Sequence, residues 1–356
     1  SVHLTERQGR ELGAEMLPKL AVGSGREFRR QGMSCVMISH KLNEVSAVAD
    51  TITILRDGAV IESLDNSVER VTEERIIKGM VGRDLTHRFP ERDHVVGEVV
   101  FEVRNWNVDH PTQDGRTVIK DVSMNVRAGE VIGIAGLMGA GRTEFAMSLF
   151  GRSYGRHITG TALKDGREID VSSIRKAVGH GLAYVTEDRK TYGLILNEDV
   201  KTNITLANLE AISTNLVMSR PKEIRVANEY RDALSIKCSS VRQRAVNLSG
   251  GNQQKVVLSK WLFAQPDVLI LDEPTRGIDV GAKFEIYTII NDLASQGKAI
   301  IFISSELPEI LGISDRIYVM AEGAIAGEMP VGEASQEAIM RCIMAARRAV
   351  SDGAAA

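Results

Sequence analysis

The stretch Glu130-Val-Ile-Gly-Ile-Ala-Gly136 runs directly into Gly136-Leu-Met-Gly-Ala-Gly-Arg-Thr143. The first segment is apolar and predicts a buried strand, and a helical pattern, Glu144–Phe150, follows the glycine-rich turn. Glycines let the backbone curl so that successive N–H groups and the helix N-terminus point at phosphate oxygens, while the Thr143 hydroxyl can bind Mg²⁺. This layout predicts a phosphate-binding loop made of Gly136, Leu137, Met138, Gly139, Ala140, Gly141, Arg142 and Thr143.

One position departs from the usual phosphate-loop pattern, which has Lys between the last Gly and the Thr. The residue here is Arg142. Its planar guanidinium keeps the positive charge but cannot replace a compact ammonium in a tight loop without altering the geometry. We therefore expect nucleotide binding to survive and hydrolysis to weaken. Taken alone, the stretch also allows a glycine-rich turn that binds no ligand.

Two adjacent carboxylates follow a second apolar run, Val268-Leu-Ile-Leu-Asp-Glu-Pro274. The run predicts a buried strand, and its carboxyl end is where ligands bind in open α/β sheets. At this position Asp272 is expected to hold Mg²⁺ through water, and Glu273 to polarise the attacking water. The alternative is a pair of solvated acids, which the phosphate loop upstream disfavours.

A third motif, Asn247-Leu-Ser-Gly-Gly-Asn-Gln-Gln-Lys255, precedes another helical apolar pattern. Ser249, Gly250 and Gly251 at the start of this helix predict a second anion-binding site through backbone N–H groups and the helix dipole. An ordinary serine N-cap is the alternative interpretation, and for the motif alone it is the simpler one.

An internal repeat divides the chain. Cys35–Val60 matches Ile300–Ile325 without gaps at an offset of 265 residues. Each copy predicts a short buried strand, a polar turn, a helix and a strand that ends at a glycine turn. The recurring residues are Ile38, Ser39, Leu42, Glu44, Asp50, Ile52 and Gly58, which match Ile303, Ser304, Leu307, Glu309, Asp315, Ile317 and Gly323.

The repeat predicts the tail of one domain joined to a complete second one. Residues 1–88 are interpreted as a truncated C-terminal remnant, with 1–30 unassigned, and 89–97 as a linker. A complete domain at 98–348, with a helical insert at about 194–262, and a disordered tail at 349–356 follow. The insert has helix-spaced apolar residues at Ile204, Leu206, Leu209 and Ile212.

Composition limits the function classes. The chain has 356 residues, 43% of them hydrophobic, and a formal charge of -3, so no electrostatic footprint for nucleic acid is visible. Three distant cysteines, Cys35, Cys238 and Cys342, lack metal or redox spacing and predict reduced thiols of a cytosolic protein. No apolar run is long enough to span a membrane, so a soluble chain is expected, and any membrane role requires a partner.

The order of these motifs resembles that of ABC transporter ATPases. One branch is especially similar, the tandem ATPases of bacterial monosaccharide importers such as the ribose, galactose and xylose systems. The resemblance covers about residues 33–346. It is carried by Gly-Ala-Gly-Arg-Thr at 139–143, Thr186-Glu-Asp-Arg-Lys190, Leu-Ser-Gly-Gly-Asn at 248–252, Leu271-Asp-Glu-Pro-Thr-Arg-Gly-Ile-Asp279 and Ile303-Ser-Ser-Glu-Leu307.

The resemblance implies that two ATPase halves pair head to tail, with ATP between the phosphate loop of one half and the signature of the other. Ser249 and Gly251 would then contact the γ-phosphate of ATP on the opposite half. Glu187 stands near the position of the glutamine in the usual coupling loop, and Asp279 lies in the loop that signals between sites. Thr143 and Asp272 would bind the metal, and Glu273 would be the catalytic base.

The switch position differs between the two copies of the repeat. The first copy reads Ile38-Ser39-His40, and the second reads Ile303-Ser304-Ser305. By the resemblance a histidine there contacts the γ-phosphate, so His40 is assigned a catalytic role, although a surface histidine is the alternative. Ser305 is too short for the same direct contact. Together with Arg142 it predicts a degenerate second site that binds ATP and hydrolyses it slowly.

These expectations converge on a P-loop α/β fold with a mostly parallel sheet, a small antiparallel β portion near Val99–Val126 and a helical insert. The predicted function is the ATP-binding, energy-coupling subunit of a monosaccharide importer that uses ATP and Mg²⁺ at the cytoplasmic face of the inner membrane. Its implied partners are permease subunits, a second ATPase half or another copy of the chain, and indirectly a periplasmic sugar-binding protein. A nucleotide-binding module with little turnover is the alternative, and a nucleic-acid function is disfavoured.

Overall fold

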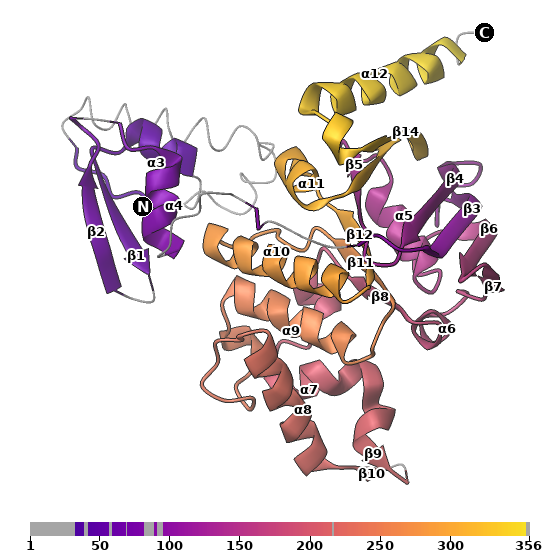
Figure 1. The fold of residues 1–356 in the computed structure, drawn as a ribbon, viewed down its shortest axis with the longest axis horizontal. Helices are drawn as coiled ribbons and strands as arrows, with labels where there is room; N and C mark the ends of the chain where they lie inside the picture. Colours follow the sequence, from indigo (N-terminus) through magenta and orange to yellow (C-terminus); the bar gives the residue numbers. More distant parts are fainter. Residues whose placement is uncertain are drawn as a thin grey trace. The chain divides into compact units, whose positions relative to one another are not determined.

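The computed structural model describes residues 33–38, 42–56, 59–68, 70–81, 89–90, 95–215 and 217–353. They belong to two compact units (Figure 1), one within residues 1–87 together with 279–281, the other formed by 88–278 and 282–356. The first unit has one hydrophobic core and the second has two. Within the described ranges, no helix is both long enough and apolar enough to cross a bilayer.

A six-stranded sheet forms the centre of the second unit. Its strand order is β14-β13-β5-β12-β11-β8, and all neighbours are parallel except β13 and β14. This confirms the predicted α/β fold with a mostly parallel sheet. The strands are β5 (Val131–Gly136), β8 (Leu182–Val185), β11 (Val268–Asp272), β12 (Ala299–Ile303), β13 (Arg316–Ala321) and β14 (Ala324–Pro330).

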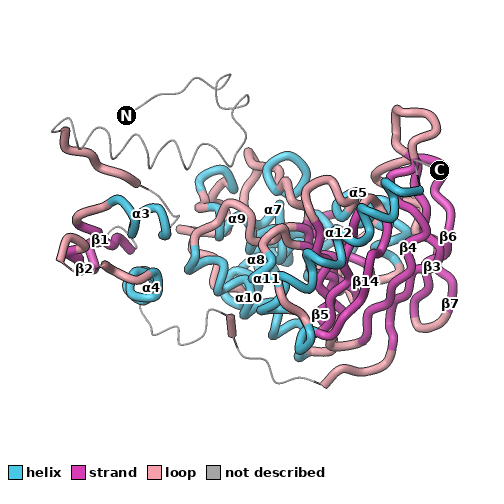
Figure 2. Tube along the Cα trace, turned by 90° about the horizontal axis from the view of Figure 1, so that it is seen from above, coloured by secondary structure: helices cyan, strands magenta, loops and turns pink. Residues whose placement is uncertain are grey.

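Helices cover both faces of this sheet, as continuous apolar strands require. In β5, Ile132 and Ile134 pack into one core and Val131 and Ala135 into the other, because successive side chains alternate. The first core includes α5 (Arg142–Leu149) and α6 (Ile174–Gly179). The second includes α9 (Gly250–Leu262), α10 (Val280–Ser295), α11 (Leu307–Ile313) and α12 (Gln336–Gly353). In Figure 2, α10 and α11 lie beside β5 of this sheet.

A second, antiparallel sheet has the order β4-β3-β6-β7. Its first strands, β3 (Val99–Asp109) and β4 (Thr117–Arg127), confirm the predicted antiparallel portion, and β6 (Arg156–Lys164) and β7 (Arg167–Ile169) extend it. Trp106 of β3 is buried, and its Nε1 donates to the hydroxyl of Ser148 in α5 at 2.9 Å. This bond ties the antiparallel sheet to the helix that begins at the glycine loop.

The helical insert lies between β8 and β11. It contains α7 (Val200–Thr205), a 3₁₀ turn (Leu206–Ile212), the β9–β10 hairpin (Ser213–Thr214 and Val217–Met218), α8 (Arg220–Ala233) and a 3₁₀ turn (Ala245–Asn247) before α9. The predicted apolar stripe is only half correct, because Ile204 and Ile212 are buried whereas Leu206 and Leu209 are 41% and 42% exposed. The α-helix changes to 3₁₀ geometry at Leu206, and the non-helical backbone of Asn208 rotates the stripe away from the core.

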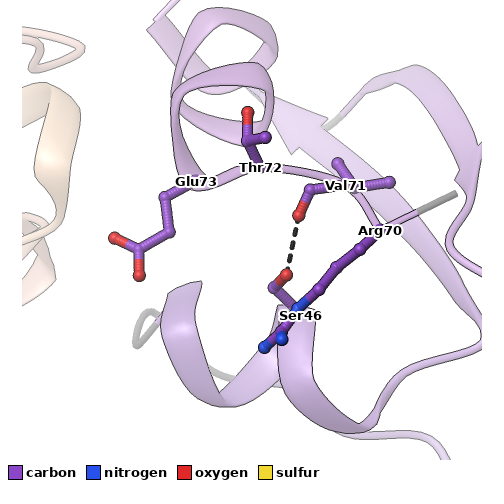
Figure 3. Close-up of a pocket in the computed structure, with 5 residues that line it drawn as sticks. All are labelled: Ser46, Arg70, Val71, Thr72 and Glu73. Carbon is purple, nitrogen blue, oxygen red and sulfur yellow. Dashed lines mark hydrogen bonds between the residues drawn. The ribbon is translucent and has the colours of Figure 1, made fainter.

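The first unit contains α3 (Leu42–Val48), β1 (Thr51–Arg56), β2 (Ala59–Asp65) and α4 (Glu73–Val81), with β1 and β2 antiparallel. Leu42, Ile52, Ile54 and Ile76 form its core. Hydrogen bonds fix the connection to α4, since the Ser46 hydroxyl donates to the Val71 carbonyl oxygen at 2.6 Å (Figure 3). The hollow around this bond is lined by Ser46, Arg70, Val71, Thr72 and Glu73.

The structure corrects one expectation for the first unit. Residues 33–38 form no strand, and Val36 and Ile38 are 95% and 96% exposed, whereas a buried strand was predicted there. In the second unit the matching strand, β12, lies between β5 and β11. The described part of the first unit contains no strand equivalent to either neighbour, so the apolar residues have no sheet in which to be buried.

The start of the predicted linker and most of the predicted tail have defined structure. The ring of Phe89 lies 5.2 Å from that of Tyr287, and the Asn291 amide donates to the Pro90 carbonyl oxygen at 3.0 Å. The start of the linker therefore packs onto the second unit. Helix α12 continues to Gly353, so residues 349–353 are helical rather than part of a disordered tail.

Candidate functional site

Four loops of the second unit leave its main sheet at one edge. The parallel strands β5, β8, β11 and β12 end there, with Ile303 in register with both Ile134 and Asp272, and Leu271 with Val185. The residues that follow these strands therefore converge. Carboxyl ends of parallel strands are the usual position of ligand sites in α/β sheets. The predicted phosphate loop, the two acids, the Ser304-Ser305 turn and Glu187 all follow these strand ends.

The phosphate loop has the backbone that its glycines permit. Gly139 and Gly141 have φ values of +79° and +98°, and Gly141 is the N-cap of α5. A Cβ atom on Gly141 would lie 2.9 Å from Ile119 Cδ1, and one on Gly136 would lie 2.7 Å from the Met320 carbonyl oxygen. The loop therefore requires glycine for both conformation and space. Its tip residue Met138 is 93% exposed.

Arg142 reaches away from the loop towards the neighbouring strands. Its Nη1 donates to the Ser304 carbonyl oxygen at 2.5 Å, and its Nη2 lies 3.7 Å from Glu273 Oε1. Both side chains of this ion pair are about nine-tenths buried. A guanidinium can bridge the two acceptors because its donors are spread over a planar fork. The substituted residue of the phosphate loop is thus paired with the predicted catalytic base.

Asp272 is completely buried at the end of β11. Burial raises the pKa of its carboxyl group, and hydrogen bonds from the hydroxyls of Tyr184 and Thr143 oppose this rise. Tyr184 donates to Oδ2 at 2.9 Å, whereas Oδ1 is buried without a hydrogen-bond partner. An unpartnered buried carboxylate oxygen is costly unless a ligand satisfies it. Sequence reasoning missed Tyr184, which lies within an apolar strand and looks like a core residue.

Glu273 adopts a left-handed backbone conformation with φ of +47°, which is uncommon for a residue other than glycine. Its carboxylate is only 9% exposed, and it accepts a hydrogen bond from the Ser305 hydroxyl at 3.2 Å. Burial raises the pKa of Glu273, while Arg142 and Ser305 lower it. A base with a raised pKa is suited to accept a proton near neutral pH.

A buried network centred on Glu309 supports this edge of the sheet. Its carboxylate accepts hydrogen bonds from Thr275 Oγ1 (2.7 Å to Oε2), Tyr287 OH (2.7 Å), Ser304 Oγ (2.7 Å) and Lys283 Nζ (2.7 Å). These donors come from the turns after β11 and β12 and from α10. The network fixes both turns to the same carboxylate. The repeat pointed to Glu309, because Glu44 occupies the same position in the first copy. It gave no indication of the side chains that donate hydrogen bonds to Glu309.

Glu187 and Arg189, which follow β8, contact the turn after Glu273. The Glu187 carboxylate forms an ion pair with the Arg276 guanidinium, and Arg189 Nη1 donates to the Arg276 carbonyl oxygen at 2.7 Å. The predicted coupling residue Glu187 is therefore partnered by arginine rather than directed at the phosphate loop. The motif Thr186–Lys190 contained Arg189, but nothing in its pattern revealed the partner.

The predicted signature lies at the start of α9. Ser249 is the N-cap of α9, because its Oγ accepts from the Asn252 backbone N–H at 3.5 Å, and it also accepts from the Asn252 side-chain amide at 2.9 Å. A Cβ atom on Gly251 would lie 2.5 Å from that of Ala282, and Gly250 faces Arg189 and Gly277. Asp279 immediately precedes α10. His40 lies outside the described residues.

Comparisons with known proteins agree with this geometry. Residues 119–276 match the family model described as "ABC transporter". Solved ATP-binding cassettes of ABC transporters are similar in fold: one covers 69% of this chain and 98% of its own length at a TM-score of 0.59 and 18% identity. Another, nucleotide-free, covers 70% and 96% at a TM-score of 0.57 and 18% identity. Residues 119–276 are thus similar to an ABC transporter domain, and the second unit has the fold of an ATP-binding cassette.

Protein sequences similar to this chain include ATP-binding proteins of sugar transporters. The L-arabinose transport ATP-binding protein of Geobacillus stearothermophilus is 60% identical over 92% of this chain and 64% of its own length. The xylose import ATP-binding protein of Thermoanaerobacter pseudethanolicus is 52% identical over 89% of this chain and 62% of its own length. The chain thus spans less than two thirds of the length of these sugar-transport relatives.

Proposed function

We propose that this chain is the ATP-binding, energy-coupling part of an importer for monosaccharides, acting at the cytoplasmic face of the membrane. The observation that carries the proposal is the convergence of the phosphate loop, Asp272, Glu273 and Ser305 at one sheet edge. The sugar class is inferred from relatives whose names specify L-arabinose and xylose transport. Direction of transport rests on the same relatives.

The residues present fit ATP with Mg²⁺. In the part of the chain that the structure describes, no three His, Cys, Asp or Glu side chains gather as a metal site, so the nucleotide itself would have to complete the coordination. Thr143 and Asp272 would hold the ion, and the unpartnered Oδ1 of Asp272 supports this assignment. When bound, Mg²⁺ neutralises charge on the phosphates. Gly136–Thr143 would orient the phosphate chain through backbone N–H groups.

We infer that hydrolysis in this cassette's own site is slow. Glu273 would accept the proton of the attacking water, but its carboxylate is engaged by both Arg142 and Ser305. Burial keeps the pKa of Glu273 above its usual value, so the carboxylate can take up a proton, but water must first displace these two partners to reach it. Ser305 is also too short to act as the histidine of the first copy would. The competent site would combine Ser249 and Gly251 with the phosphate loop of another cassette.

Residues 33–81 are proposed to be the C-terminal portion of such another cassette. Helix α3 and strands β1 and β2 have the boundaries of α11, β13 and β14 at the offset of the repeat, which supports this origin. His40 would be its switch residue. The partners expected from the relatives are permease subunits and a second cassette, from this chain or another copy, with a sugar-binding protein acting indirectly. Nucleic acid is not expected.

The test is to measure ATP affinity and the ATPase rate on the purified chain, with Glu273→Gln as the control. We expect Mg²⁺-dependent ATP binding with a low rate, and little change in affinity in Glu273→Gln. Rapid turnover abolished by Glu273→Gln would contradict the slow-site proposal and favour an active homodimer. Binding with no turnover under any condition would favour a nucleotide-binding module. Absence of ATP binding would exclude the proposed function.

A further inference from the structure

Arg189 lies where three segments of the second unit meet. It follows β8 and opens a π-helical turn, Arg189–Gly193. Its Nη1 donates to the Arg276 carbonyl oxygen at 2.7 Å and its Nη2 to that of Gly277 at 3.4 Å. Both acceptors belong to the residues 273–277, which we name the catalytic turn. Arg189 therefore holds the main chain of this turn, independently of the side chains on it.

The same guanidinium contacts the start of α9. A Cβ atom on Gly250 would lie 2.9 Å from Arg189 Nη2 and 3.1 Å from the Gly277 carbonyl oxygen. On the next residue, Gly251, a Cβ atom would lie 2.5 Å from that of Ala282. Residues 249–251, the signature turn, are thus enclosed between Arg189 and α10. They have little room to shift unless Arg189 or the catalytic turn shifts too.

Placing the Arg189 guanidinium here has a desolvation cost, which argues that the residue has a specific role. Burial lowers the pKa of its guanidinium, and its Nε is buried without a hydrogen-bond partner. Two carbonyl oxygens on adjacent residues match the planar fork of arginine, whereas a lysine ammonium on a flexible stem could reach only one of them well. The site therefore selects the shape of arginine as well as its charge.

The far end of the π-helical turn is fastened to α9. Lys260 donates from Nζ to the Gly193 carbonyl oxygen at 2.6 Å, and burial lowers the pKa of this lysine to about 8. The turn is held at its first residue by the catalytic turn and at its last by α9. Because α9 begins at the signature turn, the Arg189–Gly193 segment forms a short link between the catalytic turn and the signature.

Nucleotide binding at the phosphate loop is expected to shift the catalytic turn. Arg142 of the phosphate loop is paired with Glu273, and the Arg276 N–H donates to the Glu273 carbonyl oxygen at 3.1 Å. Phosphate oxygens in the loop would compete with Glu273 for the Arg142 guanidinium. Release of Glu273 would change the turn whose carbonyl oxygens hold Arg189. The contacts from the phosphate loop to the catalytic turn, and from the catalytic turn to the signature turn, therefore all lie within one cassette.

We propose that Arg189 is a positioning residue that transmits nucleotide binding at Gly136–Thr143 to the signature turn of the same cassette. The proposal rests on the proposed function, because it requires ATP to bind at this phosphate loop. The signature turn of this cassette, which would contact ATP bound to another cassette, would then respond to ATP bound at the phosphate loop of this cassette.

The test is amide hydrogen exchange on the full chain with and without ATP and Mg²⁺, in the wild type, Arg189→Lys and Arg189→Ala. In the wild type we expect ATP to slow exchange both at residues 136–143 and at 249–255. Arg189→Lys should keep the protection at 136–143 and lose the ATP-dependent protection at 249–255. Arg189→Ala should do the same, and the melting temperature without nucleotide shows whether each variant is folded.

Two matched variants sharpen this test. Arg175→Ala changes an arginine whose side chain is 94% exposed and should behave as the wild type. Arg276→Ala removes the ion pair with Glu187 but leaves the carbonyl oxygen that Arg189 uses, so it should keep ATP-dependent protection at 249–255. Unchanged protection at 249–255 in Arg189→Lys, or its absence in the wild type, would overturn the proposal. Absence of protection at 136–143 in the wild type would instead reject the proposed ATP site.

Discussion

The two copies of the repeat have the same local structure but different surroundings. Helix α3 and strands β1 and β2 of the first unit begin and end 265 residues before α11, β13 and β14 of the second. Even the register shift recurs, between Ile54 and Leu55 in one hairpin and between Val319 and Met320 in the other. A helix and a hairpin formed from neighbouring residues are therefore specified by the sequence of the repeat itself.

The copies differ at the strand that precedes them. Ile303 is 1% exposed within β12, whereas its counterpart Ile38 is 96% exposed in a segment without secondary structure. The sequence pattern is apolar in both. A buried parallel strand needs neighbours that are distant in sequence, here β5 and β11. The comparison shows that the same pattern becomes a strand only where the rest of the sheet is present.

The largest change in stability should come from truncating the side chain of Ile303, the buried residue of the pair Ile38 and Ile303. Ile303→Ala should lower the free energy of unfolding of the second unit by about 3 kcal/mol, because it leaves a cavity in the core that also contains Ile132 and Ile134. Urea unfolding followed by the fluorescence of Trp106 and Trp261, both in the second unit, would measure it, and far-UV circular dichroism would follow the unfolding of the first unit, to which Ile38 belongs. Ile38→Ala, at the exposed position, should change stability by less than about 0.5 kcal/mol. Equal effects at the two positions would show that 33–38 is buried in solution.

A smaller loss of stability is expected when Glu309, the counterpart of Glu44 in the repeat, is replaced by glutamine. Burial raises the pKa of Glu309, but Lys283 and the hydroxyl donors outweigh this, and the pKa lies below its usual value. The stabilisation is therefore present above the unfolded-state pKa of about 4.3 and is lost as the pH falls through the folded-state pKa. Glu309→Gln should cost about 2 kcal/mol at pH 7 and progressively less in acid.

Urea unfolding of Glu309→Gln between pH 7 and pH 3 would check this prediction. The matched control is Glu306→Gln, because Glu306 also pairs with Lys283 but its side chain is 47% exposed. Its cost should be below about 1 kcal/mol at every pH. A cost of Glu309→Gln that does not change with pH would show that the charge of Glu309 contributes nothing.

The smallest effect concerns the switch position, where the copies have His40 and Ser305. Ser305→His, which copies the first repeat, and Arg142→Lys, which restores the usual phosphate-loop residue, should together raise the ATPase rate by about tenfold, or about 1.4 kcal/mol of barrier. The added imidazole can reach the γ-phosphate, and the substitution of Arg142 releases Glu273. Adding Glu273→Gln to this variant should remove the gain. No gain would mean that the slow turnover has another origin.

Much of the candidate site could be predicted because its residues are grouped in short motifs. The glycine loop, Asp272 and Glu273 follow apolar strands, and the rule that ligands bind at the carboxyl ends of parallel strands brings them together. The partners of these residues could not be predicted. Tyr184 and Arg189 lie about 90 residues from the groups they bind, and no local pattern marks such a pair. Residues 206 and 209 were misplaced because a change to 3₁₀ geometry has no apolar signature of its own.

The sequence by itself determined the class of fold, the nucleotide-binding loops and the duplicated helix and hairpin, because each depends on spacing within a few residues. Only the tertiary structure decided that Arg142 lies on Glu273 and Ser304, that Asp272 keeps one oxygen unpartnered and that Arg189 joins the catalytic turn to the signature turn. The physical reason is that buried charges are paired by the packing of the sheet, which sets neighbours across its strands rather than along the chain.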